Sequence, residues 1–230
     1  MESEMNQLKT VFSRPWSIRL PILTRYLEAK YVDEFFEDGS LRLSSFTKFR
    51  KSPDEERGDI FEGRVNMEIT SPNAHHAICA ISGQEAYVMS TTTVETRKLG
   101  ASLKSDSGFR ILNSLAFADC VSRQIAGFLG GCQGLCIYRD DIMIQKKDSE
   151  PIRTPESYLN PEEWVADYEK YVSKHIVDAF FLKRAEYSHQ GEYRFIWFAQ
   201  GAEKDHLDIK CPDAIKYCER LTTDQLEQRT

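Results

Sequence analysis

Residues 189–199, HQGEYRFIWFA, join a polar head to a strongly apolar run that is rich in aromatic side chains. This composition predicts a strand. Because side chains alternate between the two faces of a strand, Glu192 and Arg194 share one face and Tyr193 lies on the other. A carboxylate and a guanidinium at the head of a strand can position a substrate in a cleft. The residues alone favour a simpler interpretation, an exposed ion pair at a sheet edge, which contributes little.

The chain before this segment alternates between helical and extended patterns. Apolar residues recur at helical spacing in residues 21–38, and Gly39 ends that segment. Pro161 opens a second helix, which Asn160 caps. A further helix is expected within residues 109–129, and strands are expected at residues 40–46, 64–70, 76–81 and 87–95. Residues 134–140 and 142–146 are expected to form a strand pair or one bent strand.

These elements interleave without a repeated βα unit, which favours an α+β fold over a doubly wound sheet. We therefore expect mixed or antiparallel sheets with flanking helices. Residues 1–230 are expected to form a single domain, with flexible ends at 1–13 and 222–230 and a short closing helix within 211–221.

Composition limits the classes of function. The chain has 230 residues, 41% of them hydrophobic, and a net charge of −6. This acidic balance argues against tight non-specific nucleic-acid binding, although a local basic groove stays compatible with it. The N-terminal residues lack the order of a secretory signal, and no apolar run is long enough to cross a membrane. We therefore expect a cytoplasmic protein with reduced cysteines and no membrane partner.

Several common cofactor and metal motifs are missing. The sequence has neither the glycine-rich dinucleotide fingerprint nor the phosphate-binding P-loop. Residues 47–63 are dense in charge, with acids from Asp54 to Asp59, but the calcium-loop spacing of carboxylates is absent. A solvated or lid loop is therefore expected there, and no metal site.

Two further strands carry polar residues that can bind a ligand. Arg42 in SLRLSSF lies opposite two leucines, and one arginine in a short strand can grip a phosphate. A solvent-facing arginine is the alternative. Ser90, Thr91 and Thr92 in YVMSTTTVE can donate hydrogen bonds to a neighbouring carboxylate or to a ligand. The strand propensity of threonine explains them equally well.

These residues follow one another as Arg42, then Ser90-Thr91-Thr92, then Gln190-x-Glu192. That order resembles the Arg–Ser–Glu signature of ADP-ribosyltransferases. The resemblance implies an ADP-ribosyltransferase-like fold and NAD as a substrate. The chain departs from the family pattern in having Ser-Thr-Thr for Ser-Thr-Ser and Gln-x-Glu for Glu-x-Glu. Gln-x-Glu variants generally imply an acceptor other than arginine.

The resemblance also implies roles on the NAD side of the site. Arg42 would hold the NAD phosphates, and Ser90 with Thr91 and Thr92 would shape the nicotinamide pocket. Tyr187, or else Tyr193, would border or stack on the nicotinamide.

On the acceptor side, Glu192 would be the catalytic carboxylate, hydrogen-bonded to the ribose and stabilising positive charge on it. Gln190 would orient the acceptor, and residues 183–189 would help to select it.

A looser resemblance covers more of the chain. Residues 26–63 and 181–198 are similar to uncharacterised bacterial proteins associated with abortive infection and phage defence. The shared features are a Gly-x-Leu-Arg strand and a charged loop that ends in Asp-x-x-Glu-Gly, here Gly39, Arg42, Asp59, Glu62 and Gly63. Together the two resemblances imply a toxin that modifies RNA, DNA or a protein and that an antitoxin protein would accompany.

Two other functions fit the sequence. One is a non-enzymatic antitoxin, sensor or protein-binding module of a defence system, which would use residues 47–63 as its binding surface. The other is a metal-dependent nuclease that would use the acidic loop. NAD binding and resistance to chelation distinguish the transferase from both.

Overall fold

Strand β11 (Glu192–Ala199) lies inside an eight-stranded sheet, between β5 and β7, in a computed structural model of the chain. The structure describes residues 20–53, 58–81, 83, 85–141, 143–151, 153–201 and 205–221. The other strands of this sheet are β1 (Leu23–Leu27), β2 (Ser40–Ser45), β5 (Ala86–Thr92), β6 (Ser107–Ile111), β7 (Phe128–Leu135), β12 (His206–Lys210) and β13 (Cys218–Arg220). All its pairings are antiparallel.

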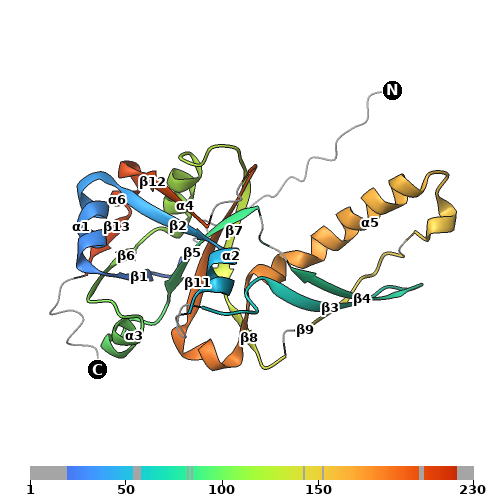
Figure 1. Cartoon of the computed structure of the whole chain (residues 1–230), viewed down its shortest axis with the longest axis horizontal. Helices are drawn as coiled ribbons and strands as arrows, with labels where there is room; N and C mark the ends of the chain where they lie inside the picture. The colour runs from blue at the N-terminus through green and yellow to red at the C-terminus, as the bar shows by residue number, and fades with distance from the viewer. Residues whose placement is uncertain are drawn as a thin grey trace, which may run out of the picture.

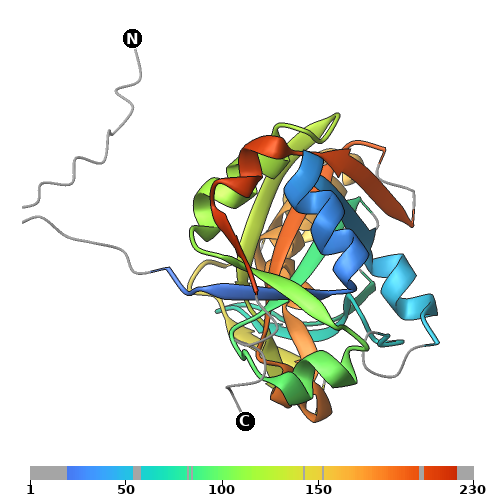
Figure 2. The same cartoon turned by 90° about the vertical axis from the view of Figure 1, so that its left-hand side faces the viewer.

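The large sheet divides along one edge of β5. On its other edge, β5 pairs with β11 from Thr92↔Glu192 to Ala86↔Phe198. On the divided edge, β2 pairs only at Val88 and Tyr87, and β1 pairs only at Thr92. The strands β1 and β6 therefore turn away from β2 and β12, and Figure 2 shows β1 (blue) crossing the steep orange strand β11. This division opens a gap beside residues 89–91.

Two smaller sheets and the helices complete the described fold. A three-stranded sheet holds β3 (Arg64–Thr70), β4 (His75–Ile81) and β9 (Met143–Lys147), and a two-stranded sheet holds β8 (Ile137–Arg139) and β10 (Leu182–Arg184). The α-helices are α1 (Ala29–Asp38), α2 (Phe46–Lys51), α3 (Arg97–Ser102), α4 (Ser114–Ser122), α5 (Pro161–Ile176) and α6 (Pro212–Ile215). The 3-10 helices are η1 (Pro155–Ser157), η2 (Val177–Phe180) and η3 (Ala185–Gln190).

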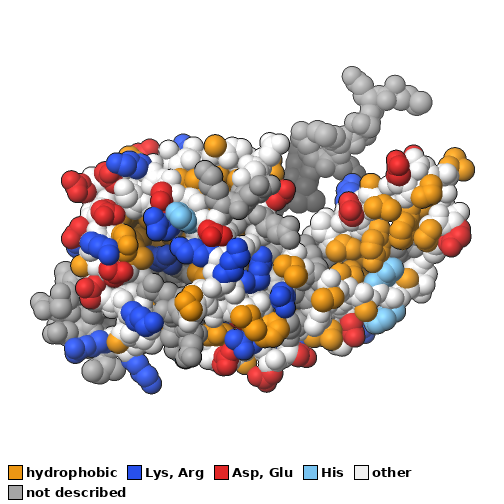
Figure 3. Space-filling view, in the orientation of Figure 1, with side chains coloured by type: hydrophobic (Ala, Val, Ile, Leu, Met, Phe, Trp, Pro, Cys, Tyr) orange, Lys and Arg blue, Asp and Glu red, His pale blue; other side chains and the backbone are white. Residues whose placement is uncertain are grey.

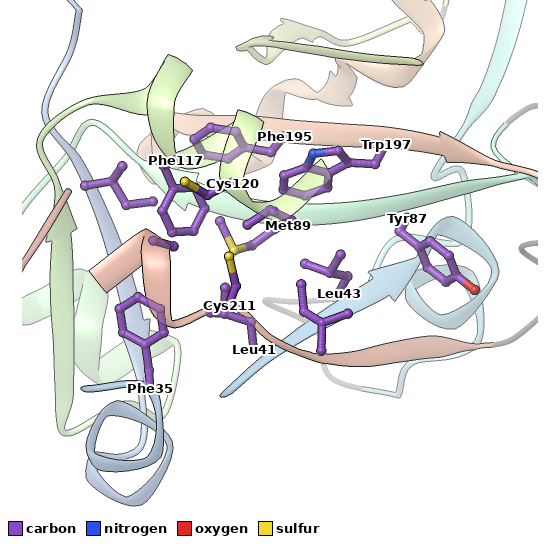
Figure 4. Packing of buried hydrophobic residues seen from close by; sticks show 14 of the residues in the cluster. Phe35, Leu41, Leu43, Tyr87, Met89, Phe117, Cys120, Phe195, Trp197 and Cys211 are labelled. Atoms are coloured by element: carbon purple, nitrogen blue, oxygen red, sulfur yellow. The ribbon is translucent and has the colours of Figure 1, made fainter. Parts of the chain in front are cut away.

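The main core lies on one face of the large sheet. Tyr193, Phe195 and Trp197 of β11 all point into it, as the alternation along a strand requires. They pack with residues of α1, α4 and α6, including Phe35 and Phe117 (Figure 4). The opposite face of β11 carries Ile196 into a smaller core together with residues from α2, β5 and η2.

A second body of structure extends from the large sheet. The strands β3, β4 and β9 run alongside the long helix α5 and project to one side (Figure 1). Met67 and Ile69 of β3 are buried there with Ile144 of β9, and Tyr171 of α5 packs against this cluster. The helix begins as expected, because the Asn160 side chain accepts a 2.9 Å hydrogen bond from the Glu162 N–H.

The structure confirms an α+β fold with mixed and antiparallel sheets, since β3 pairs with β9 and β10 pairs with β8 in parallel. It also confirms the strands expected near 40–46, 64–70, 76–81 and 87–95. The helix expected at 21–38 is wrong in its first part, since residues 23–27 form β1 and only 29–38 are helical. Likewise, the helix expected within 109–129 is limited to α4, and the closing helix within 211–221 is limited to α6. The expected loop at 47–63 begins with α2.

Some expectations lie outside the described residues. They are the ends at 1–13 and 222–230 and most of the acidic run, residues 54–57. Within the described part of the chain, no helix combines the length and the apolar character that crossing a membrane requires.

Candidate functional site

A cleft of about 800 Å³ opens where the large sheet divides. Its walls come from β1, β2 and β5, with further residues from α1, α2, α3 and β12. Glu192 at the head of β11, Lys183 of β10 and Glu62 also line it. Lysine and arginine side chains gather on the surface around α2 (Figure 3), where Lys48 belongs to the cleft wall. Glu28, Glu34 and Asp208 line the cleft as well, so its rim is basic near α2 and mixed in charge elsewhere. Buried carboxylates lie inside the cleft.

The structure brings Ser90 and Glu192 together inside this cleft. Ser90 Oγ donates a 2.6 Å hydrogen bond to Glu192 Oε1, although 102 residues separate them in the sequence. The pairing of β5 with β11 causes this contact, because Thr92 lies opposite Glu192 and Ser90 lies opposite Arg194. Side chains of directly and diagonally opposed residues on one face of such a pair lie within reach of each other.

Glu192 belongs to a buried group of four charged residues. Arg194 Nε donates to Glu192 Oε1 at 2.7 Å, and Arg194 Nη1 forms an ion pair with Glu62 Oε1 at 2.5 Å. Lys183 Nζ binds Glu192 Oε2. The side chains of all four residues are at most 6% exposed. The exposed edge pair that the residues alone favoured is therefore wrong, because β7 covers the edge of β11 that a terminal strand would leave open.

The buried charges fix the ionisation of this group. Burial by itself would raise the pKa of Glu192, but the Arg194 guanidinium and the Lys183 ammonium outweigh it and hold that pKa well below its usual range. Burial raises the pKa of Glu62 in spite of Arg194. Burial opposes the charge of Lys183, yet Glu192 raises the pKa of this lysine. Glu192 is therefore an anion at neutral pH, and Lys183 is a cation.

Arg25 on β1 is a cleft residue that the sequence analysis missed. Its guanidinium Nη1 donates to the main-chain oxygen of Ser90. This oxygen lies on the divided edge of β5, between the residues that pair with β2 and the one that pairs with β1. A strand carbonyl group that no neighbouring strand pairs needs another donor, and Arg25 supplies it.

Arg42 lies at the rim of the same cleft. It faces away from the core as expected, and its side chain is 52% exposed. Asp208 of β12 binds the guanidinium with both oxygens, at 2.6 Å from Nε and 3.0 Å from Nη2. The Arg42 guanidinium holds the pKa of Asp208 below its usual range. A carboxylate thus already occupies the planar fork of Arg42, whereas Arg25 reaches the centre of the cleft.

Gln190, Thr91 and Thr92 also line the cleft. Gln190 is buried, and its side-chain oxygen accepts a 2.8 Å hydrogen bond from Lys183 Nζ. Thr92 Oγ1 donates to the Gln190 main-chain oxygen at 2.6 Å, and Thr91 Oγ1 donates to the Tyr193 oxygen at 2.9 Å. The threonines therefore hold the backbone around Glu192 in place.

Tyr187 and Tyr193 do not border the cleft, which corrects the expectation for both. Tyr187 is buried in η3, where its ring lies beneath Lys183 and its hydroxyl donates to the Gly58 oxygen at 3.1 Å. Tyr193 points into the main core, because it lies on the face of β11 opposite Glu192. Both tyrosines support the site from behind.

Among the charged cleft residues, Arg25 was not named in the sequence analysis, Lys183 was included only in the acceptor-selecting segment 183–189, and Glu62 only in the Asp-x-x-Glu-Gly motif. Arg25 was hidden because residues 21–38 also fit a helical period; the strand-forming Thr24 and Tyr26 beside it were the available signal. Nothing local marks Glu62 and Lys183 as buried partners of Arg194 and Glu192, since those contacts join distant strands.

Comparison of the chain with protein-family models, with curated proteins and with solved structures found no match. Among the residues that the structure describes, no group of three or more His, Cys, Asp or Glu side chains is arranged to hold a metal ion.

Proposed function

We propose that the protein is an NAD-dependent ADP-ribosyltransferase, and that its fold is of the ADP-ribosyltransferase type. The observation that carries the proposal is the Ser90–Glu192 hydrogen bond inside a cleft that arginines border. The order of these residues in the sequence resembles the Arg–Ser–Glu signature, and their convergence in one cleft supports that resemblance. A buried carboxylate that stays ionised in a cleft is also typical of functional sites in general.

The residues of the cleft suit the chemical parts of NAD. The cleft volume lies within the range of small-molecule sites, which is about 300–1,000 Å³. Arg25 and Lys48 carry the positive charge that a diphosphate needs. Leu99 and Leu103 supply apolar contact for the rings. We assign the phosphate contact to Arg25 ahead of Arg42, because Arg25 contacts Ser90 inside the cleft, whereas the Arg42 side chain is half exposed at its rim.

Glu192 and Gln190 act at the reacting end of the cleft. When the bond between nicotinamide and ribose breaks, its electron pair goes to the pyridinium nitrogen, and the ribose carbon accepts a lone pair from the acceptor, which loses a proton. Positive charge develops on the ribose, and the ionised Glu192 carboxylate stabilises it. Ser90 holds that carboxylate, and Gln190 orients the acceptor.

The acceptor and the setting rest on the resemblances alone. We propose that the protein is a cytoplasmic toxin of phage defence, that it modifies RNA, DNA or a protein, and that an antitoxin protein restrains it. A basic rim around α2 on an acidic chain agrees with an acceptor that carries phosphates.

The experiment incubates the purified protein with NAD labelled in its adenylate part and with cell extract, then separates nucleic acid from protein. Glu192→Gln removes the charge of the carboxylate, and Glu219→Gln is the control, since Glu219 is half exposed on β13. Circular dichroism checks that both variants fold. We expect label in one fraction with the wild type and with the control, and none with Glu192→Gln. Transfer should survive EDTA, which separates it from the nuclease.

Label that is unchanged in Glu192→Gln would remove this carboxylate from the mechanism. No label in either fraction, together with no NAD binding by calorimetry and no toxicity on expression, would favour the non-enzymatic binding module.

A further inference from the structure

We propose that Lys183 is a positioning residue of the cleft, whose ammonium group holds the Glu192 carboxylate and the Gln190 amide in one arrangement. This inference rests on the proposed transferase function, since the two side chains that Lys183 aligns are the ones assigned to that reaction. It adds to that function a residue that acts through its neighbours.

The contacts of Lys183 link the two functional side chains directly. Its Nζ donates to Gln190 Oε1 at 2.8 Å and also binds Glu192 Oε2. An ammonium group has donors only, so the Gln190 amide must turn its oxygen toward Lys183. The ring of Tyr187 lies 4.7 Å from the same ammonium and closes the site from behind. The lysine thereby fixes the direction in which the amide nitrogen of Gln190 points.

The backbone holds Lys183 and Glu192 in register. Lys183 of β10 pairs in parallel with Tyr138 of β8, and the Ile137 N–H donates to the Phe181 oxygen at 2.7 Å. The same strand also binds the head of β11, because the Glu192 N–H donates to the Tyr138 hydroxyl at 2.7 Å. One short strand therefore fixes the distance between the lysine and the carboxylate.

The charge balance explains why a cation stands at this position. The described groups that face Glu192 are Arg194 from β11, Lys183 from β10, Glu62 before β3, Cys136 before β8, Tyr138 from β8 and Ser90 from β5. Among them Lys183 and Arg194 are the two cations that contact the Glu192 carboxylate directly. Without Lys183 one of these two positive charges is lost, and Glu192 binds a proton more readily.

Lys183 differs from Arg194 in what it contacts. Arg194 also binds Glu62 and the Phe180 oxygen, at 2.5 Å and 2.7 Å, so its loss would disturb the packing between strands. The hydrogen bonds of Lys183 go to two side chains that line the cleft. A change at Lys183 should therefore reach the reaction more selectively than a change at Arg194.

The experiment compares Lys183→Met and Lys183→Arg with the wild type, with Lys216→Met as the control because the Lys216 side chain is 60% exposed. Carbon-13 NMR follows the titration of the Glu192 carboxyl group, which Glu192→Gln assigns. The rate of ADP-ribose transfer is measured against pH in parallel. Both readouts use the full chain.

In Lys183→Met we expect the titration of Glu192 to move up by about one pH unit or more, as loss of a contacting opposite charge does. We expect kcat to fall roughly 100-fold, the scale of a small misplacement of reacting groups, with KM for NAD little changed. In the profile of kcat against pH, the midpoint of the acid limb should move to higher pH by the same amount as the Glu192 titration. Lys183→Arg should keep Glu192 ionised yet lower kcat, because its planar fork cannot reproduce both contacts.

An unchanged Glu192 titration and an unchanged kcat in Lys183→Met would overturn the proposal. If Lys183→Met does not fold, Lys183→Arg tests the proposal instead, and an unaltered kcat in Lys183→Arg overturns the proposal. The NMR titration needs no turnover. If the wild type transfers no ADP-ribose, but the Glu192 titration still moves up in Lys183→Met, the transferase function is rejected and the role of Lys183 in the cleft is upheld.

Discussion

The Arg25 guanidinium donates to the main-chain oxygen of Ser90 at the point where β2 has left β5 and β1 has joined it. A side chain thus replaces strand pairing at the divided edge of the sheet, and the contact joins residues that are 65 positions apart in the sequence. It also holds a positive charge next to the Ser90–Glu192 pair. The division of the sheet thus creates the cleft and places a cation in it.

The first prediction concerns NAD binding. Arg25→Ala should raise the Kd for NAD by about tenfold or more, since a hydrogen bond to a charged group contributes about 1.5–3 kcal/mol. Arg42→Ala should have a smaller effect, because the Arg42 side chain is half exposed at the rim of the cleft. Isothermal calorimetry measures both, with circular dichroism as the check on folding. Equal losses in the two variants would contradict the assignment of the phosphate contact to Arg25.

The second prediction concerns stability. Arg194→Met leaves Glu62 and Glu192 buried with one cation between them, and breaking such a pair costs about 3–5 kcal/mol. Urea unfolding should show this loss. Arg123→Met should leave the unfolding midpoint nearly unchanged, because the Arg123–Asp119 pair is exposed. A small effect at Arg194 would mean that the buried group is not tightly coupled to the fold.

The third prediction concerns pH. The pKa of Glu192 is lower in the folded protein than in the unfolded chain, where it is about 4.3. Ionisation of Glu192 therefore contributes stability that is fully present above that value and is lost as the pH falls through the folded pKa. The difference in free energy of unfolding between wild type and Glu192→Gln should be constant from about pH 6 to 8 and should shrink below about pH 5. Urea unfolding at several pH values tests this. A difference in free energy of unfolding that grows as the pH falls would contradict a lowered pKa of Glu192.

The fourth prediction concerns the turn before Glu192. Gly191 has φ +50°, and a Cβ there would lie 2.6 Å from Val94 Cγ2. Gly191→Ala should therefore destabilise the protein by about 1 kcal/mol or more and displace the adjacent carboxylate. Gly130→Ala is the matched control, because a Cβ at Gly130 meets no atom within 4 Å. Thermal unfolding of the two variants decides, and equal midpoints would contradict the strain.

The fifth prediction concerns the thiols. Cys79 is exposed, whereas burial raises the pKa of Cys132 to about 11 and that of Cys218 to about 12. Because the thiolate is the reactive form, iodoacetamide at neutral pH should modify Cys79 well before the other two. Peptide mapping by mass spectrometry measures the order. Early modification of Cys218 would show that α6 and β13 open readily.

Local sequence patterns correctly predicted those elements whose residues fit only one type of secondary structure. The helix at Pro161 has a cap and an acidic first turn, and the strand that begins at Glu192 is rich in aromatic and apolar residues. The segment 23–27 fits two periods, and its strand partners β5 and β6 settle the outcome. Tertiary pairing overrides weak local preference in such cases.

The sequence predicted the candidate site only in part, because some of its features depend on contacts between distant strands. The order of Arg42, Ser90 and Glu192 is visible in the sequence, and all three line the cleft. Their burial is not visible, because it depends on β7 covering β11 and on β10 bringing Lys183 to Glu192. An ion pair on a strand has the same sequence at an edge and in the middle of a sheet.

The division of the sheet has a consequence for biosynthesis. The cleft takes one wall from strands near the start of the chain and its carboxylate from β11, which follows nearly all the others. While the chain is still being translated, Arg25 and Ser90 can leave the ribosome long before Glu192 does. A nascent polypeptide therefore has no complete cleft until β11 has emerged and paired with β5, and any activity of that cleft begins only after this pairing.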